Sequence, residues 1–338
     1  MVAKVATWEG ESKYVGVASF CQHDCGWYSI VLTEGYDTTP RANGSSNWPF
    51  HPLFPLTAYP LQHWLGLPAA VSLVVASKLA LLLAIYAFLL LVGAETGSIA
   101  ERIFSGSLVA FNPYVIYAHA GYAEPLYFAV LALGFYCLEK QRWIDSGIAG
   151  ALTSASRMIG FVFALSYATA WLKQSKWRPS WRRSDQLLGL MLCPLGSVIF
   201  MLYLYRHTGD ALAQVHGQVA WGKSLGNPVL VFLHAYNLHH WPRVWAFMTI
   251  GSLLASVYLF VVGKAELAIY LAVSMLLSLS GGLLSLARYI WWQPPFLCAI
   301  YYLLRRHRAW WPVYTAFAAA LSAYMIIGWW LLGHIFVV

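Results

Sequence analysis

One carboxylate near the start of the chain has the surroundings expected of a proton acceptor. Asp24 stands beside His23 and shortly before Trp27 and Tyr28, in a segment rich in aromatic residues. A carboxylate held against apolar surface has its charged form disfavoured, so its pKa rises and it becomes a better base. The other interpretation, an exposed acid that caps a helix, stays open because one acid is a weak signal.

Two arginines are suited to binding an anion. Arg157 lies inside an apolar run, where an ionisable side chain is costly and marks a functional site unless it serves a structural pairing. Arg288 and Tyr289 follow a run of small residues at positions 280–285, at the edge of the membrane. A guanidinium there suits the oxygens of a lipid phosphate, and the alternative is a boundary arginine that extends toward the headgroups.

Three more residues complete the candidate set. His51 lies in a proline-bounded aromatic turn, and Tyr122 and Glu124 stand at the start of an apolar run. A histidine satisfied by its own loop and an acid stabilised by a helix dipole are the simpler interpretations of His51 and Glu124. The sequence has no glycine-rich phosphate loop, metal-ligand cluster or Ser/His/Asp arrangement, so we expect no metal site and no cofactor.

The five cysteines form no recognisable framework. Their odd number, without the spacing of a zinc site, predicts neither a set of disulfides nor a metal centre. Cys21 and Cys25 lie four residues apart and are able to pair, but the geometric limits on bridging favour two free thiols.

Composition indicates the scaffold that must position these residues. Of the 338 residues, 60% are hydrophobic and 10% are charged, whereas an ordinary soluble domain carries roughly 25% charged residues. At about 20 residues per crossing, we expect an all-α polytopic membrane protein with about 9–11 membrane helices, some short or re-entrant. The net charge of +8 does not indicate nucleic-acid binding, because the basic residues lie in short loops between apolar runs.

The apolar runs and basic loops predict which segments share a side of the membrane. The runs lie at residues 69–92, 103–118, 122–138, 148–171, 187–205, 244–262, 267–286, 294–304 and 312–338. The basic loops at 140–142, 173–183 and 305–308 should be cytoplasmic. For the first two loops to share a side, run 148–171 must enter the membrane and return with Arg157 at its turn. Small residues between Gly147 and Gly160 allow two such half-helices to pack closely.

These assignments predict a single membrane domain over residues 1–338. Residues 1–67 form a non-cytoplasmic interfacial segment with the catalytic loop, and residues 68–338 form a transmembrane bundle with an outer loop at about 206–243. Residues 1–20 carry Lys4, Glu9, Glu11 and Lys13 and cannot span the membrane. Either a preceding helix lies outside this sequence, or the whole segment is translocated.

Short motifs along most of the chain resemble the PIG-V-type mannosyltransferases, which are multi-pass GT-C glycosyltransferases. The main resemblance is His23-Asp-Cys-Gly-Trp-Tyr-Ser-Ile30, followed by Glu34-Gly-Tyr36 and by Trp48-Pro-Phe-His-Pro-Leu-Phe-Pro55. Further matches follow in family order at Phe111-Asn-Pro113, Gly121-Tyr-Ala-Glu124, Leu152-Thr-Ser-Ala-Ser-Arg157, Thr208-Gly-Asp-Ala-Leu-Ala213, Trp221-Gly222 and Ser285 with Arg288-Tyr289. The order of these motifs and their membrane positions carry the match.

The resemblance implies a GT-C-like fold and an inverting glycosyltransferase. The sugar, mannose by preference, would pass from a polyprenyl- or dolichyl-phosphate-linked donor to a glycolipid, glycan or protein hydroxyl on the non-cytoplasmic face. Carried over by position, Asp24 would be the base, and Arg288, Arg157 and Tyr289 would bind the donor phosphate. The sugar and acceptor pocket would be shaped by His23, Trp27, Tyr28, His51, Tyr122 and Glu124. No divalent cation is required, since positive groups aimed at the developing phosphate charge lower the barrier.

The resemblance also implies a location, because the chain is short for the eukaryotic members of that family. This favours a bacterial or archaeal plasma-membrane protein over one of the endoplasmic reticulum. Its partners would be the lipid-linked donor, membrane lipids and the acceptor, with no nucleic acid. A transporter or lipid flippase without chemistry is the competing prediction, but it would show pseudo-symmetric halves with paired broken helices, which the sequence lacks. A non-catalytic scaffold has no reason to gather Asp24, His51 and Arg288 on one face.

Overall fold

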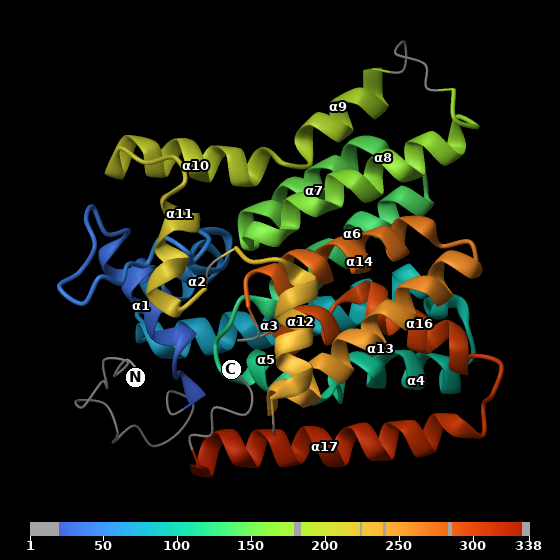
Figure 1. The fold of residues 1–338 in the computed structure, drawn as a ribbon. Coiled ribbons are helices and arrows are strands. Elements are labelled where there is room, and N and C mark those ends of the chain that lie inside the picture. Colours follow the sequence, from blue (N-terminus) through green and yellow to red (C-terminus); the bar gives the residue numbers. More distant parts are fainter. Residues whose placement is uncertain (1–19, 179–183, 224, 239–240, 283–285, 333–338) are drawn as a thin grey trace.

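The computed structural model describes residues 20–178, 184–223, 225–238, 241–282 and 286–332, and no strand occurs within these ranges (Figure 1). Residues 1–19, the part 179–183 of the basic loop, Ser285 and the part 333–338 of the last apolar run lie outside them. The α-helices are α1 (Asp24–Glu34), α2 (Leu53–His63), α3 (Ala69–Val92), α4 (Ile99–Ala110), α5 (Ile116–His119), α6 (Glu124–Glu139), α7 (Trp143–Ser156), α8 (Phe163–Gln174), α9 (Ser184–Leu192), α10 (Leu195–Thr208), α11 (Ala213–His216), α12 (Pro228–Asn237), α13 (Trp241–Val261), α14 (Ala265–Ser280), α15 (Leu286–Trp291), α16 (Pro294–Leu304) and α17 (Trp310–Leu332). Short 3-10 helices are η2 (Ala94–Thr96), η3 (Pro113–Val115), η4 (Met158–Val162) and η5 (Gly217–Trp221).

Three of the described helices are long and apolar enough to cross a membrane, namely α3 and most of α13 and α17. Two bent pairs raise the number to 5 if each pair is one span: α5 with α6, bent by 111°, and α9 with α10, bent by 45°. The chain is therefore a helical protein with the features of an integral membrane protein. The expectation of about 9–11 membrane helices is too high on these criteria, even though α14 and α16 add two shorter apolar helices.

The excess arose because apolar runs were counted as continuous helices. Run 103–118 is split after α4, where the side chain of Asn112 accepts a hydrogen bond from the Tyr114 N–H and Pro113 starts a new turn. Run 187–205 is split at Pro194, which separates α9 from α10. Proline removes a helical hydrogen bond and crowds the preceding turn, so it bends or ends a helix within an apolar run. The outer segment 206–243 likewise contains helices, α11, η5 and α12, instead of an extended loop.

Run 148–171 breaks at the expected residue. Arg157 has extended backbone angles between α7 and η4, and α7 and α8 then run in opposite directions side by side (Figure 1). Two of the small residues pack the half-helices as expected, because a Cβ on Gly150 would lie 2.8 Å from the Phe163 ring of α8 and one on Gly160 would meet the Thr153 carbonyl of α7. Others pack α7 on the next two helices. A Cβ on Gly147 would lie 2.4 Å from the Gly189 carbonyl oxygen of α9, and one on Gly196 of α10 would lie 2.1 Å from the Ala151 carbonyl oxygen.

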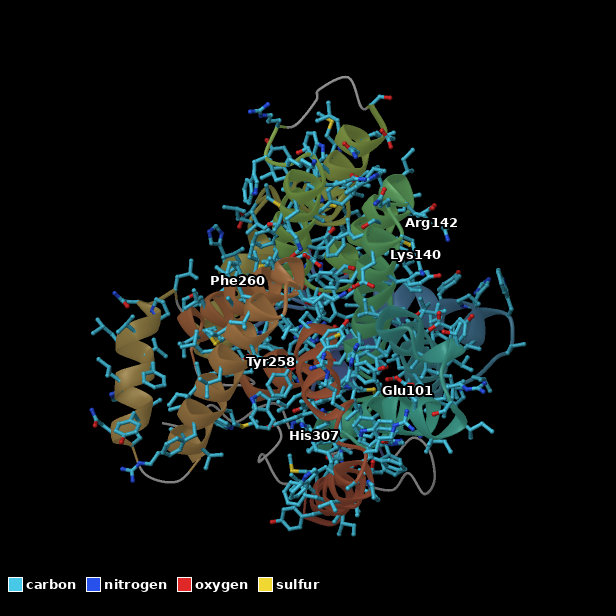
Figure 2. The ribbon with its side chains drawn as sticks, turned by 90° about the vertical axis from the view of Figure 1, so that its right-hand side faces the viewer. Glu101, Lys140, Arg142, Tyr258, Phe260 and His307 are labelled. Carbon is cyan, nitrogen blue, oxygen red and sulfur yellow. A yellow bond between two sulfur atoms is a disulfide. The ribbon has the colours of Figure 1, made fainter. Side chains whose placement is uncertain are left out.

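Several basic and acidic side chains gather at one end of the bundle. Lys264, before α14, forms an ion pair with Glu139 at the end of α6, and Lys173 at the end of α8 lies 2.8 Å from Glu266. Figure 2 views this end, with Lys140, Arg142 and His307. The three loops predicted to share a side thus reach the same end, as far as they are described.

Helix α6 separates this basic end from the candidate site. Its first residue, Glu124, belongs to the site, and its last residue, Glu139, belongs to the basic end. At 1.5 Å per residue, the 16 residues of α6 span about 24 Å. The candidate site therefore lies at the opposite end of the bundle from the basic loops.

Candidate active site

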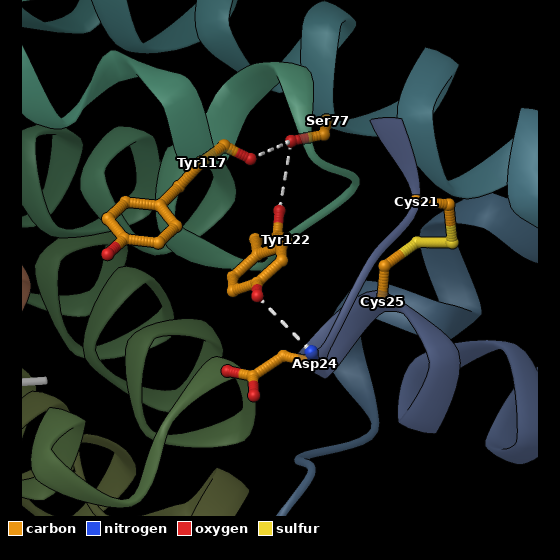
Figure 3. Close-up of a disulfide and its surroundings, with 6 residues drawn as sticks. All are labelled: Cys21, Asp24, Cys25, Ser77, Tyr117 and Tyr122. Atoms are coloured by element: carbon orange, nitrogen blue, oxygen red, sulfur yellow. Dashed lines mark hydrogen bonds between the residues drawn. A yellow bond between two sulfur atoms is a disulfide. The ribbon is translucent and has the colours of Figure 1, made fainter. Parts of the chain in front are cut away.

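A disulfide holds the segment that presents Asp24. Cys21 and Cys25 are bridged, with 5.2 Å between their Cα atoms (Figure 3), so the expectation of two free thiols was wrong. The bridge becomes possible because His23 turns the chain with a φ of 51° just before α1 begins. That left-handed angle is unusual for a residue other than glycine, and it brings the two cysteines within bridging distance.

The same segment is packed against the turn that precedes α6. Gly121 has a φ of 71°, and a Cβ at this position would lie 2.7 Å from the Cys25 Sγ. The Asp24 N–H donates to the Tyr122 hydroxyl at 3.2 Å, and the Tyr122 carbonyl accepts from the Ser77 hydroxyl of α3 at 3.0 Å (Figure 3). Backbone and disulfide together therefore fix the start of α1 on α3 and on the turn before α6.

Arg288 of α15 reaches the Asp24 carboxylate. Its Nη2 donates to Asp24 Oδ2 at 2.8 Å and to the Tyr289 hydroxyl at 3.1 Å. The Arg288 side chain is only 4% exposed, and its Nε lies 3.5 Å from Glu124 Oε1. Among the residues that the structure describes, Nε and Nη1 have no hydrogen-bond partner. A buried guanidinium with unused donors is a ready anion-binding group, because leaving such donors unsatisfied is costly.

A second arginine lies beside the first. Arg157 Nη1 donates to Glu124 Oε1 at 2.5 Å, and the Arg157 guanidinium lies 4.4 Å from the centre of the Tyr289 ring. Glu124 therefore stands between two arginines at the N-terminus of α6, where the helix dipole also favours a negative charge. The structural pairing considered for Arg157 is present, and it forms part of the cluster.

Lys223 is a third cation of the cluster, and the sequence analysis missed it. Its Nζ donates to the Tyr289 hydroxyl at 3.2 Å and lies 4.9 Å from the centre of that ring. The available signal was its place directly after the Trp221-Gly222 motif, in the outer segment predicted to face the site. The nearby Tyr117 ring, 5.2 Å from the Arg288 guanidinium, was missed as well.

Electrostatics at Asp24 differ from the expected case. Burial alone raises the pKa of this carboxyl, but the charge and hydrogen bond of Arg288, together with the charges of Arg157 and Lys223, outweigh burial. The pKa of Asp24 is therefore lowered, because the ionised form is paired. The prediction that an apolar setting raises this pKa was wrong, since the arginine 264 residues away in the chain was not visible as a neighbour.

Tyr289 has the opposite electrostatic character. Burial raises the pKa of its hydroxyl, but the positive charges of Arg288, Lys223 and Arg157 outweigh burial and lower the pKa to about 7. A tyrosine ordinarily loses its proton near pH 10. In this cluster, Tyr289 is a titratable group in the neutral range.

The aromatic residues of α1 flank the charged cluster. Trp27 stacks on Phe50 with ring centres 5.8 Å apart and meets the Trp221 ring edge-on at 5.1 Å. Tyr28 is buried and packs edge-on against Phe50. These contacts tie the helix carrying Asp24 to the segment that carries Lys223.

Two predicted pocket residues lie at the margin of the cluster. The exposed His23 ring packs edge-on against Trp329 of α17, with centres 5.2 Å apart. His51 is buried, its Nδ1 lies 3.1 Å from the Ser154 carbonyl oxygen, and burial and the charge of Arg157 lower its pKa to about 3. A neutral His51 therefore donates this hydrogen bond to α7, three residues before Arg157, and not to its own loop.

An open groove lies next to the Lys223 segment. It has a volume of about 460 Å³ and is lined by Gly226, Asn227, Leu230, Val231, His234 and Gly282. Its lining comes from the start of α12 and the end of α14. Within the described ranges, no group of three or more His, Cys, Asp and Glu residues is placed to hold a metal ion.

The structure thus brings Asp24, Arg288, Tyr289, Arg157 and Glu124 into one connected network, with Tyr122 bound to the Asp24 backbone. Such a network can hold an anion on its unused arginine donors and place carboxylate and phenol oxygens beside it. Comparisons with protein-family models, with curated proteins and with solved structures find no match to this chain.

Proposed function

We propose that the protein is an inverting glycosyltransferase. The sugar, mannose by preference, passes from a polyprenyl- or dolichyl-phosphate-linked donor to a hydroxyl of a glycolipid, glycan or protein. The observation that carries this proposal is the buried Arg288, whose Nη2 binds Asp24 while Nε and Nη1 have no hydrogen-bond partner among the described residues. The free donor of Arg288 can bind the phosphate leaving group. The carboxylate on the same guanidinium lies where it can meet the attacking hydroxyl.

The geometry supports a single displacement. A donor phosphate bound at Arg288 Nη1 places the sugar beside Asp24, which is oriented by Arg288 and by the Tyr122 hydroxyl. Asp24 takes the proton of the acceptor hydroxyl as its oxygen attacks the sugar carbon, and the electron pair of the breaking bond goes to the phosphate. Arg288, Arg157 and Lys223 then stabilise the charge that develops on the phosphate, as preorganised cations do in a water-poor site.

The groove beside Lys223 supports a lipid-linked donor. Leu230 and Val231 line it, and the loop leading to its edge carries Lys223, which reaches Tyr289 of the charged cluster. An isoprenoid chain needs an apolar surface that begins close to its phosphate. A free nucleotide sugar would have no use for such a surface.

Two observations support a non-cytoplasmic site. Disulfides persist in oxidising compartments, and the Cys21–Cys25 bridge lies directly beside Asp24. Basic loops favour the cytoplasmic side, and they lie at the other end of α6. The plasma membrane of a bacterium or archaeon fits both observations.

The test is transfer from a panel of radiolabelled polyprenyl-phosphate sugars by the purified protein in membrane discs, with identification of the labelled acceptor. We expect transfer by the wild type and loss of at least about 99% of it in Asp24→Asn, with unchanged donor binding. Arg142→Ala is the matched control, since it breaks an exposed ion pair with Asp145 at the basic end. Wild-type turnover by Asp24→Asn, or no transfer from any donor, would refute the proposal.

A further inference from the structure

Tyr289 has more cations on its hydroxyl and ring than any binding role for a neutral phenol requires. Its oxygen accepts from Arg288 Nη2 at 3.1 Å and from Lys223 Nζ at 3.2 Å. The Arg157 guanidinium lies over the ring, 4.4 Å from its centre. A neutral phenol and a phenolate can both accept these two hydrogen bonds, but only the phenolate also compensates the positive charge of the three cations. The Tyr289 side chain is half-buried, whereas its neighbours Arg288 and Ile290 are buried.

We propose that the phenolate oxygen of Tyr289, held between Arg288 and Lys223, takes the proton of the acceptor hydroxyl. This inference rests on the proposed sugar transfer and deepens it, because it changes which group is the base. Asp24 then acts as a positioning residue that aligns Arg288 through the hydrogen bond from Nη2.

The charges that face Tyr289 come from every segment of the cluster. Arg288 belongs to α15, Lys223 follows η5, and Arg157 follows α7. Asp24 of α1 opposes these cations, and Glu124 of α6 binds both arginines. At the phenol, the positive charges outweigh burial and the charge of Asp24, and the pKa falls to about 7. The same Arg288 lowers the pKa of Asp24 from its ordinary acidic value. A general base is most effective when its pKa lies near the working pH, which favours the phenolate over the carboxylate.

The step balances in atoms and charge. The acceptor O–H bond breaks and its proton goes to the Tyr289 oxygen, while the acceptor oxygen forms the new bond to the sugar carbon. The bond from that carbon to the phosphate oxygen breaks, and its electron pair leaves with the phosphate, which gains one negative charge. When Tyr289 is a phenolate, the cluster has three positive charges and three negative charges. The positive charges belong to Arg157, Arg288 and Lys223, and the negative charges to Asp24, Glu124 and Tyr289. Protonation of Tyr289 therefore raises the protein charge by one as the phosphate charge becomes more negative by one.

The first test measures ionisation without turnover. Ultraviolet absorbance of tyrosinate is followed from pH 5 to pH 9 for the wild type and for Tyr289→Phe, with Tyr324→Phe, an exposed tyrosine of α17, as the control. We expect one tyrosinate that titrates near pH 7 in the wild type and in Tyr324→Phe and is missing from Tyr289→Phe. Replacing Lys223 by Met should move this titration to higher pH, and Lys223→Arg should restore it. A titration that is the same in Tyr289→Phe overturns the proposal.

The second test is the pH profile of sugar transfer. We expect kcat/KM of the wild type to fall on the acid side with an apparent pKa near that of the absorbance titration. Tyr289→Phe should lose about a hundredfold or more at pH 8, the usual contribution of a general base, and should lose the acid limb. An acid limb that persists in Tyr289→Phe and disappears in Asp24→Asn assigns the proton to Asp24 and overturns the inference, although the proposed sugar transfer stands. Failure of the wild type with every donor refutes that function itself.

Discussion

Replacing Arg288 by lysine separates the charge of this residue from its shape. Lysine keeps the positive charge but offers one nitrogen, whereas Arg288 places Nη2 on Asp24 and Tyr289 and Nε 3.5 Å from Glu124 Oε1, and its Nη1 has no hydrogen-bond partner among the described residues. One ammonium group cannot serve these separate positions at once. We expect the loss of about two charge-assisted hydrogen bonds at roughly 1.5–3 kcal/mol each. The sum of roughly 3–6 kcal/mol corresponds to a loss of about 10²–10⁴ in kcat/KM for the donor.

The assay is steady-state transfer at varied donor concentration, with Arg142→Lys as the matched control on the exposed pair at the basic end. Thermal unfolding of each variant is recorded to separate lost folding from lost chemistry. A variant that folds and keeps kcat/KM within threefold of the wild type would show that charge alone matters at Arg288. That outcome would contradict the role of the free Arg288 donor in binding the donor phosphate.

Two further predictions concern Asp24 and its support. Pairing with Arg288 lowers the pKa of Asp24 in the folded state, so this pair stabilises the protein above the unfolded-state pKa of about 3.9, and the stabilisation is lost as the pH falls through the folded-state pKa. Chemical denaturation should therefore show a smaller loss of stability below about pH 4 in Asp24→Asn than in the wild type. An equal loss of stability in both proteins would contradict this. Replacing Cys21 and Cys25 together by serine should lower the free energy of unfolding by about 2 kcal/mol and reduce kcat with little change in donor KM. Equal stability and kcat in the oxidised wild type and the double variant would show that the bridge does not hold Asp24 in place.

The amphipathic and apolar pattern predicts helices well but predicts where they stop only in part. Run 69–92 is bounded by Pro68 and Gly93, and α3 has the same limits. A proline before a helix and a glycine after it act through local backbone chemistry, which a sequence displays. The break of run 103–118 at Asn112-Pro113 also depends on local backbone chemistry. We missed it because the run was identified from its apolar composition alone.

The candidate site was predictable by residue type, and its electrostatics were not. Asp24, Arg157 and Arg288 stood out because charged residues are rare in this chain. Their pairing depends on contacts across 33 residues for Glu124–Arg157 and 264 residues for Asp24–Arg288. The sign of the pKa change at Asp24 depends on Arg288, Arg157 and Lys223, which are all distant in the chain, so no local pattern reveals it. Lys223 was not predicted as a site residue for the same reason, since its partner Tyr289 lies 66 residues later in the chain.

The wide separation of Asp24 from Arg288 has a consequence for biogenesis. Glu124 and Arg157 neutralise one another as soon as α6 and α7 have been synthesised, so the early part of the bundle can enter the bilayer with that pair closed. Asp24 has to wait for α15, because Arg288 follows it by 264 residues. The nascent chain therefore carries a carboxylate without its counter-ion until α15 has been made and packs against α1.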